Sequence, residues 1–167
     1  MKIRPIRICG DVAYVTLTQG HEAIIDAADV SLVDKWNWYA TIRAHSIYAV
    51  RSDRIGQNKI TVLMHRVIMS DPVRLHIDHE DGDGLNNRRY NVRIATPSQN
   101  MHNMRTRCDN TSGFKGVHFS KSSGKWIARI KLNNKPNYLG LFASPEDAHA
   151  AYCRASDKYH GEFGRTE

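Results

Sequence analysis

The sequence predicts an α+β protein made of small modules in series. Its 167 residues suffice for one ordinary domain or for two or three small ones. Short apolar runs separated by turn residues fill the first part of the chain, whereas the last third has the pattern of three strands followed by one amphipathic helix. We expect four segments: an N-terminal β-rich region over 1–60, a central unit of two strands and one helix over 61–104, a basic linker over 105–112, and a C-terminal three-stranded antiparallel sheet packed on one helix over 113–167.

The formal net charge is +7, and most of the basic excess lies in the C-terminal third. Counted along the sequence, residues 101–167 carry eleven Lys and Arg side chains against six acidic ones. A polyanionic partner is therefore expected to bind there, although many basic proteins have no such partner.

The sequence contains no sign of export or of a membrane span. It has no run of about 20 apolar residues, and its first ten residues lack the apolar core of a signal peptide. The three cysteines, Cys9, Cys108 and Cys153, are far apart and form no CxxC pair, which argues against a disulfide framework and against a cysteine zinc site. We expect a soluble protein of a reducing cytoplasm, that of the host cell if a phage encodes it, with no membrane partner.

The N-terminal region predicts short strands and no catalytic constellation. A helical turn or two is expected over residues 29–35, and the strands over 12–17, 23–25, 36–42 and 47–51. Three large aromatic residues, Trp36, Trp38 and Tyr39, are expected in a core, because large aromatic side chains usually supply buried area. The apolar run at 61–69 predicts a strand that leads into a short helix, with His65 inside it.

The stretch 76–100, HIDHEDGDGLNNRRYNVRIATPSQN, predicts a hairpin followed by a capped helix. Thr96 has the position of an N-cap, and Gln99 three residues later completes a capping box. The carboxylate of Asp78 and the amide oxygen of Asn100 suit a hard cation such as Mg²⁺, which prefers oxygen ligands. His79 points to the other face of its strand and is available as a general base, since its ordinary pKa lies near 6.5. The pattern therefore predicts a metal ion and a base beside one scissile phosphodiester.

Two other interpretations of this stretch are an EF-hand loop and a plain polar hairpin. An EF-hand loop that starts at Asp78 needs Asp or Asn, Gly and Glu at its fifth, sixth and twelfth positions, where this chain has Gly82, Asp83 and Arg89, so that interpretation fails. A plain polar hairpin would account for the glycines and for the Asn86-Asn87 pair. It gives no reason for the Asp78-His79 pair before a capped helix, so the spacing favours the site over the hairpin and leaves the hairpin open.

The same stretch carries a dense set of motifs over about residues 63–103, namely His65-Arg66, Asp78-His79, Asp81-Gly82, Asn86-Asn87, Asn91 and Ser98-Gln99-Asn100. It resembles the HNH endonuclease family, in the subgroup typical of phage and group I intron homing endonucleases. By position, the resemblance implies that His79 is the general base, that Asp78 is a metal ligand, and that Asn91 is the middle asparagine that braces the loop.

The resemblance also implies the remaining site residues. Asn100 is the third motif position and the second protein ligand of one divalent ion, Mg²⁺ or Mn²⁺. Many members have His at this position, so it stays open whether Asn103, further along the same helix, completes the coordination. His65 lies either near the scissile phosphate or in a supporting role.

The C-terminal segment predicts three strands, over 114–120, 125–132 and 138–142, and a helix that covers one face of their sheet. In the second strand apolar and basic residues alternate, so one face is apolar and the other basic. Ser144 is the expected N-cap of the helix, and Gly161 its end. Small and aromatic residues form the helical stripe that is expected to lie in the core, namely Ala148, Ala151, Tyr152, Ala155 and Tyr159.

A small sheet with one basic face can enter the major groove of DNA. The motifs SGFKGV at 112–117, GKWIARI at 124–130 and YLGLF at 138–142 resemble the DNA-binding domain of plant Apetala and ethylene-response factors, over about residues 112–163. The arginine-rich first strand of those factors is not reproduced here. The expected DNA-binding residues come from the central unit, the linker and this sheet, namely Arg66, Arg105, Arg107, Lys115, His118, Ser120, Lys125, Arg129 and Lys131.

The sequence thus predicts a metal-dependent DNA endonuclease of the HNH homing type, which hydrolyses a phosphodiester of double-stranded DNA at a position set by the C-terminal sheet. The alternative is a catalytically inactive DNA-binding regulator built on the same modules. A protein that acts on RNA is also conceivable, but the exposed aromatic platforms expected for single strands are absent from the pattern. No small-molecule substrate is expected, and a monomer is slightly favoured because no dimer signature can be recognised.

Overall fold

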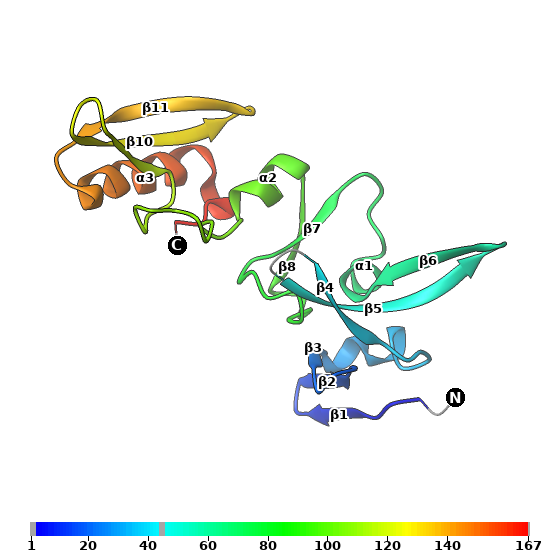
Figure 1. The fold of residues 1–167 in the computed structure, drawn as a ribbon. Coiled ribbons are helices and arrows are strands. Elements are labelled where there is room, and N and C mark those ends of the chain that lie inside the picture. Colours follow the sequence, from blue (N-terminus) through cyan, green and yellow to red (C-terminus); the bar gives the residue numbers. More distant parts are fainter. Residues whose placement is uncertain (1–2, 44–45, 167) are drawn as a thin grey trace. The chain divides into compact units, whose positions relative to one another are not determined.

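Small antiparallel sheets contain most of the regular secondary structure, and helices are few (Figure 1). The computed structural model describes residues 3–43 and 46–166. Its contacts divide the chain into two compact units, residues 1–95 and 96–167. A mixed α and β architecture is therefore confirmed, and the division into four functional segments stays a prediction.

The first unit contains three sheets. A three-stranded sheet in the order β1-β2-β3 is followed by the 3-10 helix η1, and these elements span Ile6–Cys9, Val12–Thr16, Glu22–Asp26 and Ala27–Leu32. A second three-stranded sheet in the order β4-β5-β6 leads into helix α1, with bounds Tyr39–Arg43, Ser46–Ile55, Asn58–Leu63 and Met64–Ile68. The third sheet is the antiparallel pair β7 and β8, which span His76–His79 and Val92–Ala95.

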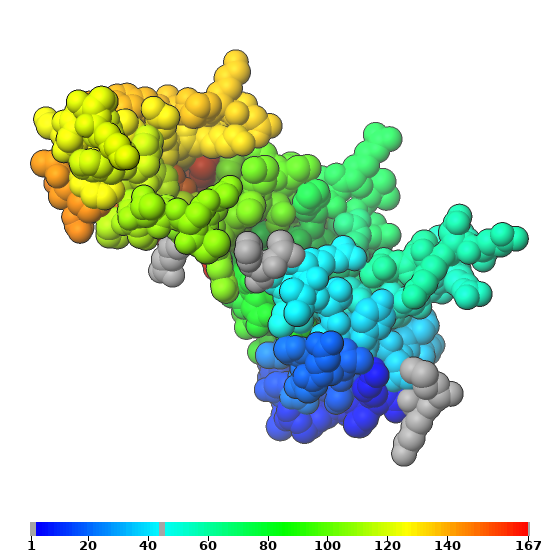
Figure 2. Space-filling model, viewed as in Figure 1, coloured from blue at the N-terminus to red at the C-terminus, as the bar shows by residue number. Residues whose placement is uncertain are grey.

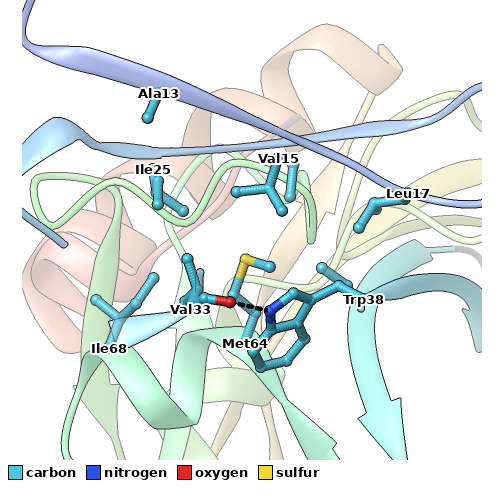
Figure 3. Packing of buried hydrophobic residues seen from close by; sticks show 10 residues of the cluster. Ala13, Val15, Leu17, Ile25, Val33, Trp38, Met64 and Ile68 are labelled. Carbon is cyan, nitrogen blue, oxygen red and sulfur yellow. Dashed lines mark hydrogen bonds between the residues drawn. The ribbon is translucent and has the colours of Figure 1, made fainter. Parts of the chain in front are cut away.

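One hydrophobic core joins the first sheet, η1 and α1 (Figure 3). The indole of Trp38 is fully enclosed and donates a hydrogen bond from Nε1 to the Val33 carbonyl at 2.9 Å. Met64 and Ile68 enter this core from α1. Each buried side chain of this size contributes about 1.5–3 kcal/mol. The core therefore fixes α1, which carries His65, against the N-terminal sheet.

Three N-terminal predictions need correction. Strand β1 was not expected, because Ile6–Cys9 is a short strand at the edge of its sheet and is mostly exposed. The Trp36 side chain is 40% exposed instead of buried, and the guanidinium of Arg51 lies 4.3 Å above its ring. Strand β5 runs on to Ile55, and its end with β6 projects from the first unit, as the turquoise part of Figure 2 shows.

The second unit contains the predicted three-stranded sheet and its covering helix. The sheet has the order β11-β10-β9, with bounds Lys135–Phe142, Lys125–Leu132 and Val117–Ser120. Helix α2 precedes it over Pro97–His102, and helix α3, Pro145–Tyr159, packs on one face before the 3-10 helix η2 at Gly161–Phe163. In β10, Trp126, Ala128, Ile130 and Leu132 pack in the cores under α3, and Lys125, Arg129 and Lys131 are exposed, so the predicted alternation is confirmed. Ile127 lies on the basic face, between Lys125 and Arg129.

Several boundaries in this unit differ from the prediction. Asn133 and Asn134 have positive φ values of 50° and 63° and form a tight two-residue turn, so β11 begins at Lys135 and not at Tyr138. Strand β9 begins only after Gly116, whose φ is +74°. In α3, Tyr159 is 48% exposed and is not part of the core, whereas Ser156, which was not expected there, is buried.

None of the helices within residues 3–43 and 46–166 is long and apolar enough to cross a membrane.

Candidate active site

The site begins on β7, where two neighbouring residues turn to opposite sides of the strand. Asp78 lies opposite Arg93 of β8, and its Oδ2 accepts hydrogen bonds from Nε and Nη2 of that arginine, each at 2.9 Å. The Asp78 side chain is only 6% exposed. Burying a carboxylate is costly unless a cation pairs with it, and Arg93 supplies that charge.

His79 faces the loop between β7 and β8. Its Nε2 lies 3.1 Å from Oδ1 of Asn87, whose Nδ2 donates to the Leu85 carbonyl at 3.1 Å. Because the amide oxygen is turned toward the ring, Nε2 carries the proton, and the lone pair of the neutral imidazole lies on Nδ1. Burial lowers the pKa of His79, although the bond to Asn87 and the carboxylates of Asp81 and Asp78 act in the opposite direction. The ring is therefore neutral at pH 7 and able to accept a proton.

His65 of α1 and Tyr48 of β5 complete an aromatic cluster around His79. The centroids of the His65 and His79 rings are 5.0 Å apart, and the Tyr48 ring lies 5.9 Å from each of them. Burial, and then the neighbouring His79, lower the pKa of His65 to about 3, so His65 is also neutral at pH 7. The structure thus brings together His65 and His79, which lie on different elements.

Asp81 and Asn91 hold the loop in shape. Asn91 accepts a hydrogen bond from the Asp81 backbone N–H at 3.0 Å and donates from Nδ2 to Oδ1 of Asp81 at 3.0 Å and to the Asn86 carbonyl at 2.7 Å. Burial acts to raise the pKa of Asp81, but hydrogen bonds from the backbone of Asp83 and from Asn86 and Asn91 lower it below its usual value. Asp81 therefore serves the geometry of the turn.

Gly84 is a glycine because the loop passes close to Tyr48. A Cβ atom there would lie 2.5 Å from the Ile47 carbonyl oxygen and 2.7 Å from the Tyr48 ring. We expect Gly84→Ala to lower the free energy of unfolding by about 1–3 kcal/mol, as overpacking usually does. Urea denaturation measures this loss, and an unchanged midpoint would show that the loop and Tyr48 move apart at no cost.

Asn100 and Asn103, the other predicted metal ligands, belong to the second unit. Asn100 lies in α2, and Asn103 is its C-cap, with only 7% of its surface exposed. The predicted capping box at Thr96 and Gln99 is present, and Pro97 opens the helix. Since α2 begins two residues after β8 ends, the order of two strands and a helix along the chain is as predicted.

The donor atoms of the predicted set suit a hard divalent cation. A carboxylate and two amide oxygens are the ligand types that Mg²⁺ and Mn²⁺ prefer. No three His, Cys, Asp or Glu side chains gather into a metal site in the part of the chain that the structure describes. The predicted set contains only one such residue, Asp78, whose enclosed carboxylate meets Arg93. A bound cation would therefore share Asp78 with this guanidinium.

The predicted DNA-binding residues fall into two groups. His118, Lys125, Arg129 and Lys131 are exposed on the sheet of the second unit, and Ser120 lies at its edge beside Ser122, 3.1 Å between their hydroxyl oxygens. Arg105 is exposed after α2. The other three are engaged within the chain: Arg66 with Asp71 and the Pro72 and Leu75 carbonyls, Arg107 with Asp109, and Lys115 with the His102 and Met104 carbonyls.

Sequence reasoning missed three residues of the site. The Asn86-Asn87 pair indicates a turn or the family motif and not the contact of Asn87 with His79, and no sequence pattern distinguishes Arg93 or Tyr48. The Asn86-Asn87 pair is the sequence signal for the first of these residues, whereas the full burial of Asn87 follows only from the fold. Tyr48 offered none, since it lies 31 positions before His79 in the sequence.

Comparison with known proteins identifies relatives of viral origin. The chain is 35% identical over 96 residues to Protein 3.8 of Escherichia phage T7, a match that covers 56% of this chain and 77% of that protein. The chain belongs to the same family as Protein 3.8. It is also 29% identical over 161 residues to a protein of Acanthamoeba polyphaga mimivirus named "Uncharacterized HNH endonuclease L560", which covers 93% of this chain and 81% of that protein.

The alignment with the mimivirus relative covers nearly the whole chain, and the name of that protein supports the HNH family. No family model matches the chain, and no solved structure matches it. The resemblance of residues 112–163 to the plant factors therefore has no support from these comparisons.

Proposed function

We propose that the protein is a metal-dependent DNA endonuclease of the HNH homing type. The observation that carries this proposal is the pair Asp78 and His79 on β7, an enclosed carboxylate next to a neutral imidazole whose Nε2 is held by Asn87. The name of the mimivirus relative supports the same activity. A two-stranded hairpin folds without an enclosed carboxylate or an enclosed imidazole, because burying such polar groups costs free energy.

His79 acts as the base in this proposal. Its Nδ1 takes a proton from a water molecule that attacks the phosphorus atom, while Nε2–H stays with Asn87 and keeps the ring in one tautomer. The lowered pKa of His79 keeps the imidazole neutral at neutral pH. His65 encloses the other side of the ring, and a direct contact of His65 with the phosphate remains part of the proposal.

By their positions in the sequence motif, Asp78, Asn100 and Asn103 are the proposed protein ligands of one Mg²⁺ or Mn²⁺. When bound, such an ion stabilises negative charge on the phosphate and on the leaving oxygen. Asn91 contributes by holding Asp81 and the loop, which keeps Asn87 at the base.

Double-stranded DNA is the proposed substrate, positioned by the basic face of the sheet in the second unit. His118, Lys125, Arg129 and Lys131 are exposed there, and exposed cations on a small sheet suit the phosphate backbone and the major groove.

A plasmid assay tests the function. Supercoiled plasmid and DNA of the source genome are incubated with the full chain and Mg²⁺, Mn²⁺ or EDTA, and nicked and linear products are separated on a gel. We expect metal-dependent nicking or linearisation. Binding without any cut product on these DNAs would instead identify a DNA-binding regulator.

Arg129→Ala is expected to weaken DNA binding and to make it less dependent on salt. A side chain that contacts one phosphate contributes about one counterion, so the slope of log K against log salt falls by about 1. Fluorescence anisotropy with a labelled duplex measures this slope. Arg154→Ala, which removes an exposed charge from α3, is the matched control. Equal slopes of log K against log salt for the two variants would show that the sheet face does not contact the DNA.

A further inference from the structure

The loop that carries Asn87 is attached to the N-terminal sheet through its backbone. The N–H of Ile24 in β3 donates to the Leu85 carbonyl at 2.9 Å, and the N–H of Asn87 donates to the Ile24 carbonyl at 2.7 Å. Ile24 and Asn86 form an isolated parallel bridge. Since β3 is at the edge of its sheet, the loop occupies backbone groups that would otherwise be open.

Asp26, at the end of β3, clamps the next two residues of the loop. Its Oδ1 accepts from Nε of Arg88 and its Oδ2 from the backbone N–H of Arg89, both at 2.8 Å. Arg88 also reaches Asp11, with Nη2 and Oδ2 2.8 Å apart. Burial acts to raise the pKa of Asp26, but the hydrogen bonds and charges of Arg89 and Arg88 lower it below its usual value. The carboxylate is therefore ionised and engaged through both oxygens.

Asp29 of η1 adds a second clamp through Arg89. The Asp29 residue is only 3% exposed, and Arg89 donates to it from Nε at 2.9 Å and from Nη2 at 2.7 Å. Nη2 also reaches the carbonyl of Ile68, the last residue of α1, at 3.2 Å. Arg89 thus joins η1, the loop and the helix that carries His65.

These ion pairs are partly exposed, with 54% of the Arg89 side chain open to solvent, and such pairs add little net stability because water screens their attraction. What these pairs do provide is a fixed position for residues 88 and 89, one and two places after Asn87. A displacement of Asn87 by about 1 Å would break its bond to His79, and misplacement on this scale costs about 100-fold in rate.

We propose that Asp26 and Asp29 are positioning residues for His79, so that the N-terminal sheet sets the tautomer and orientation of the base through Arg88, Arg89 and Asn87. This inference rests on the proposed nuclease function. It assigns a role to the N-terminal region, in which the sequence shows no catalytic constellation.

The test compares Asp26→Asn with the wild-type chain. The variant is nearly isosteric but lacks the charge that holds Arg88 and Arg89. We expect kcat for plasmid cleavage to fall about 10-fold to 100-fold while KM for DNA stays within about twofold. Asp53→Asn is the matched control, because Asp53 also accepts from an arginine side chain and from a backbone N–H but lies on the exposed part of β5. This control should change neither constant.

A second measurement does not depend on cleavage. Long-range ¹H–¹⁵N correlation spectra report the tautomer of His79, whose signals are assigned with His79→Gln. We expect Nε2–H in the wild-type chain and in Asp53→Asn, and a mixture of tautomers in Asp26→Asn. Arg88→Gln removes the contact between Asp26 and Arg88 from the loop side, and it replaces Asp26→Asn in both measurements if Asp26→Asn does not fold.

The outcomes separate this inference from the proposed function. A wild-type chain that cuts no DNA ends the nuclease proposal, and the tautomer alone then decides whether Asp26 positions His79. If the wild-type chain cuts, an unchanged tautomer in the folded variant overturns the inference, whether kcat falls or not. A lower kcat together with a mixed tautomer supports it.

Discussion

His79→Ala is expected to slow DNA cleavage by about 100-fold to 10,000-fold, the usual contribution of a positioned general base. The physical reason is that Nδ1 of His79 is the proposed proton acceptor, held by the bond between Nε2 and Asn87. Affinity for DNA should stay close to the wild-type value, because the ring is only 6% exposed and contributes little surface to an interface. Initial rates of plasmid nicking in Mg²⁺ and anisotropy with a labelled duplex in EDTA measure the two quantities separately.

Two further variants make this result specific. His76→Ala removes an exposed histidine from the same strand and should cut at the wild-type rate. Asn87→Ala should give an intermediate loss, because the base is present but its tautomer is no longer fixed. Full cleavage by His79→Ala would place the base on another residue.

Features that depend on neighbours in the sequence were predictable. The capping box at Thr96 and the cap of α3 at Ser144 need only residues within one turn of a helix. The alternation in β10 follows from the period of a strand, and the strand pair around the asparagine-rich loop follows from its apolar flanks and glycines. Asp78 and His79 could be predicted as site candidates for the same reason, because they are neighbours on a strand that precedes a capped helix.

Contacts between distant residues could not be predicted. The clamp from Asp26 to Arg88 joins positions 62 residues apart, and no local pattern distinguishes Asp26 from a solvated surface acid. Trp36 was expected in the core because of its size, whereas its place beside Arg51 depends on where β5 passes. Such pairings follow from how the sheets pack, which composition and periodicity do not specify.

The two enclosed histidines, His65 and His79, make the folded chain less stable as the pH falls. His65 in the unfolded chain binds a proton near pH 6.5, whereas in the folded chain its pKa is lowered to about 3. Between these values the unfolded state binds more protons, so the free energy of unfolding falls as the pH falls. His79, whose pKa is also lowered, acts in the same direction.

We therefore expect acidification from pH 7 to pH 5 to lower the free energy of unfolding by about 2 kcal/mol through His65 alone, since the unfolded chain gains nearly a full proton there. The range from pH 7 to pH 5 lies above the pH at which the carboxylates titrate, so the change in the free energy of unfolding comes from the histidines. His65→Gln should remove the part of this dependence that comes from His65, about 2 kcal/mol, and leave the part that comes from His79, even if it lowers stability at pH 7. His76→Gln, an exposed histidine in the same unit, should leave it unchanged.

Urea denaturation at pH 7 and pH 5, followed by tryptophan fluorescence in a Trp126→Phe background, measures these differences. In that background the remaining indoles are Trp36 and Trp38, and both belong to the first unit. A wild-type chain equally stable at both pH values would mean that His65 takes up its proton without unfolding. His65 would then be charged beside His79 at pH 5, and the proposed base would face a cation across the 5.0 Å that separate the two ring centroids.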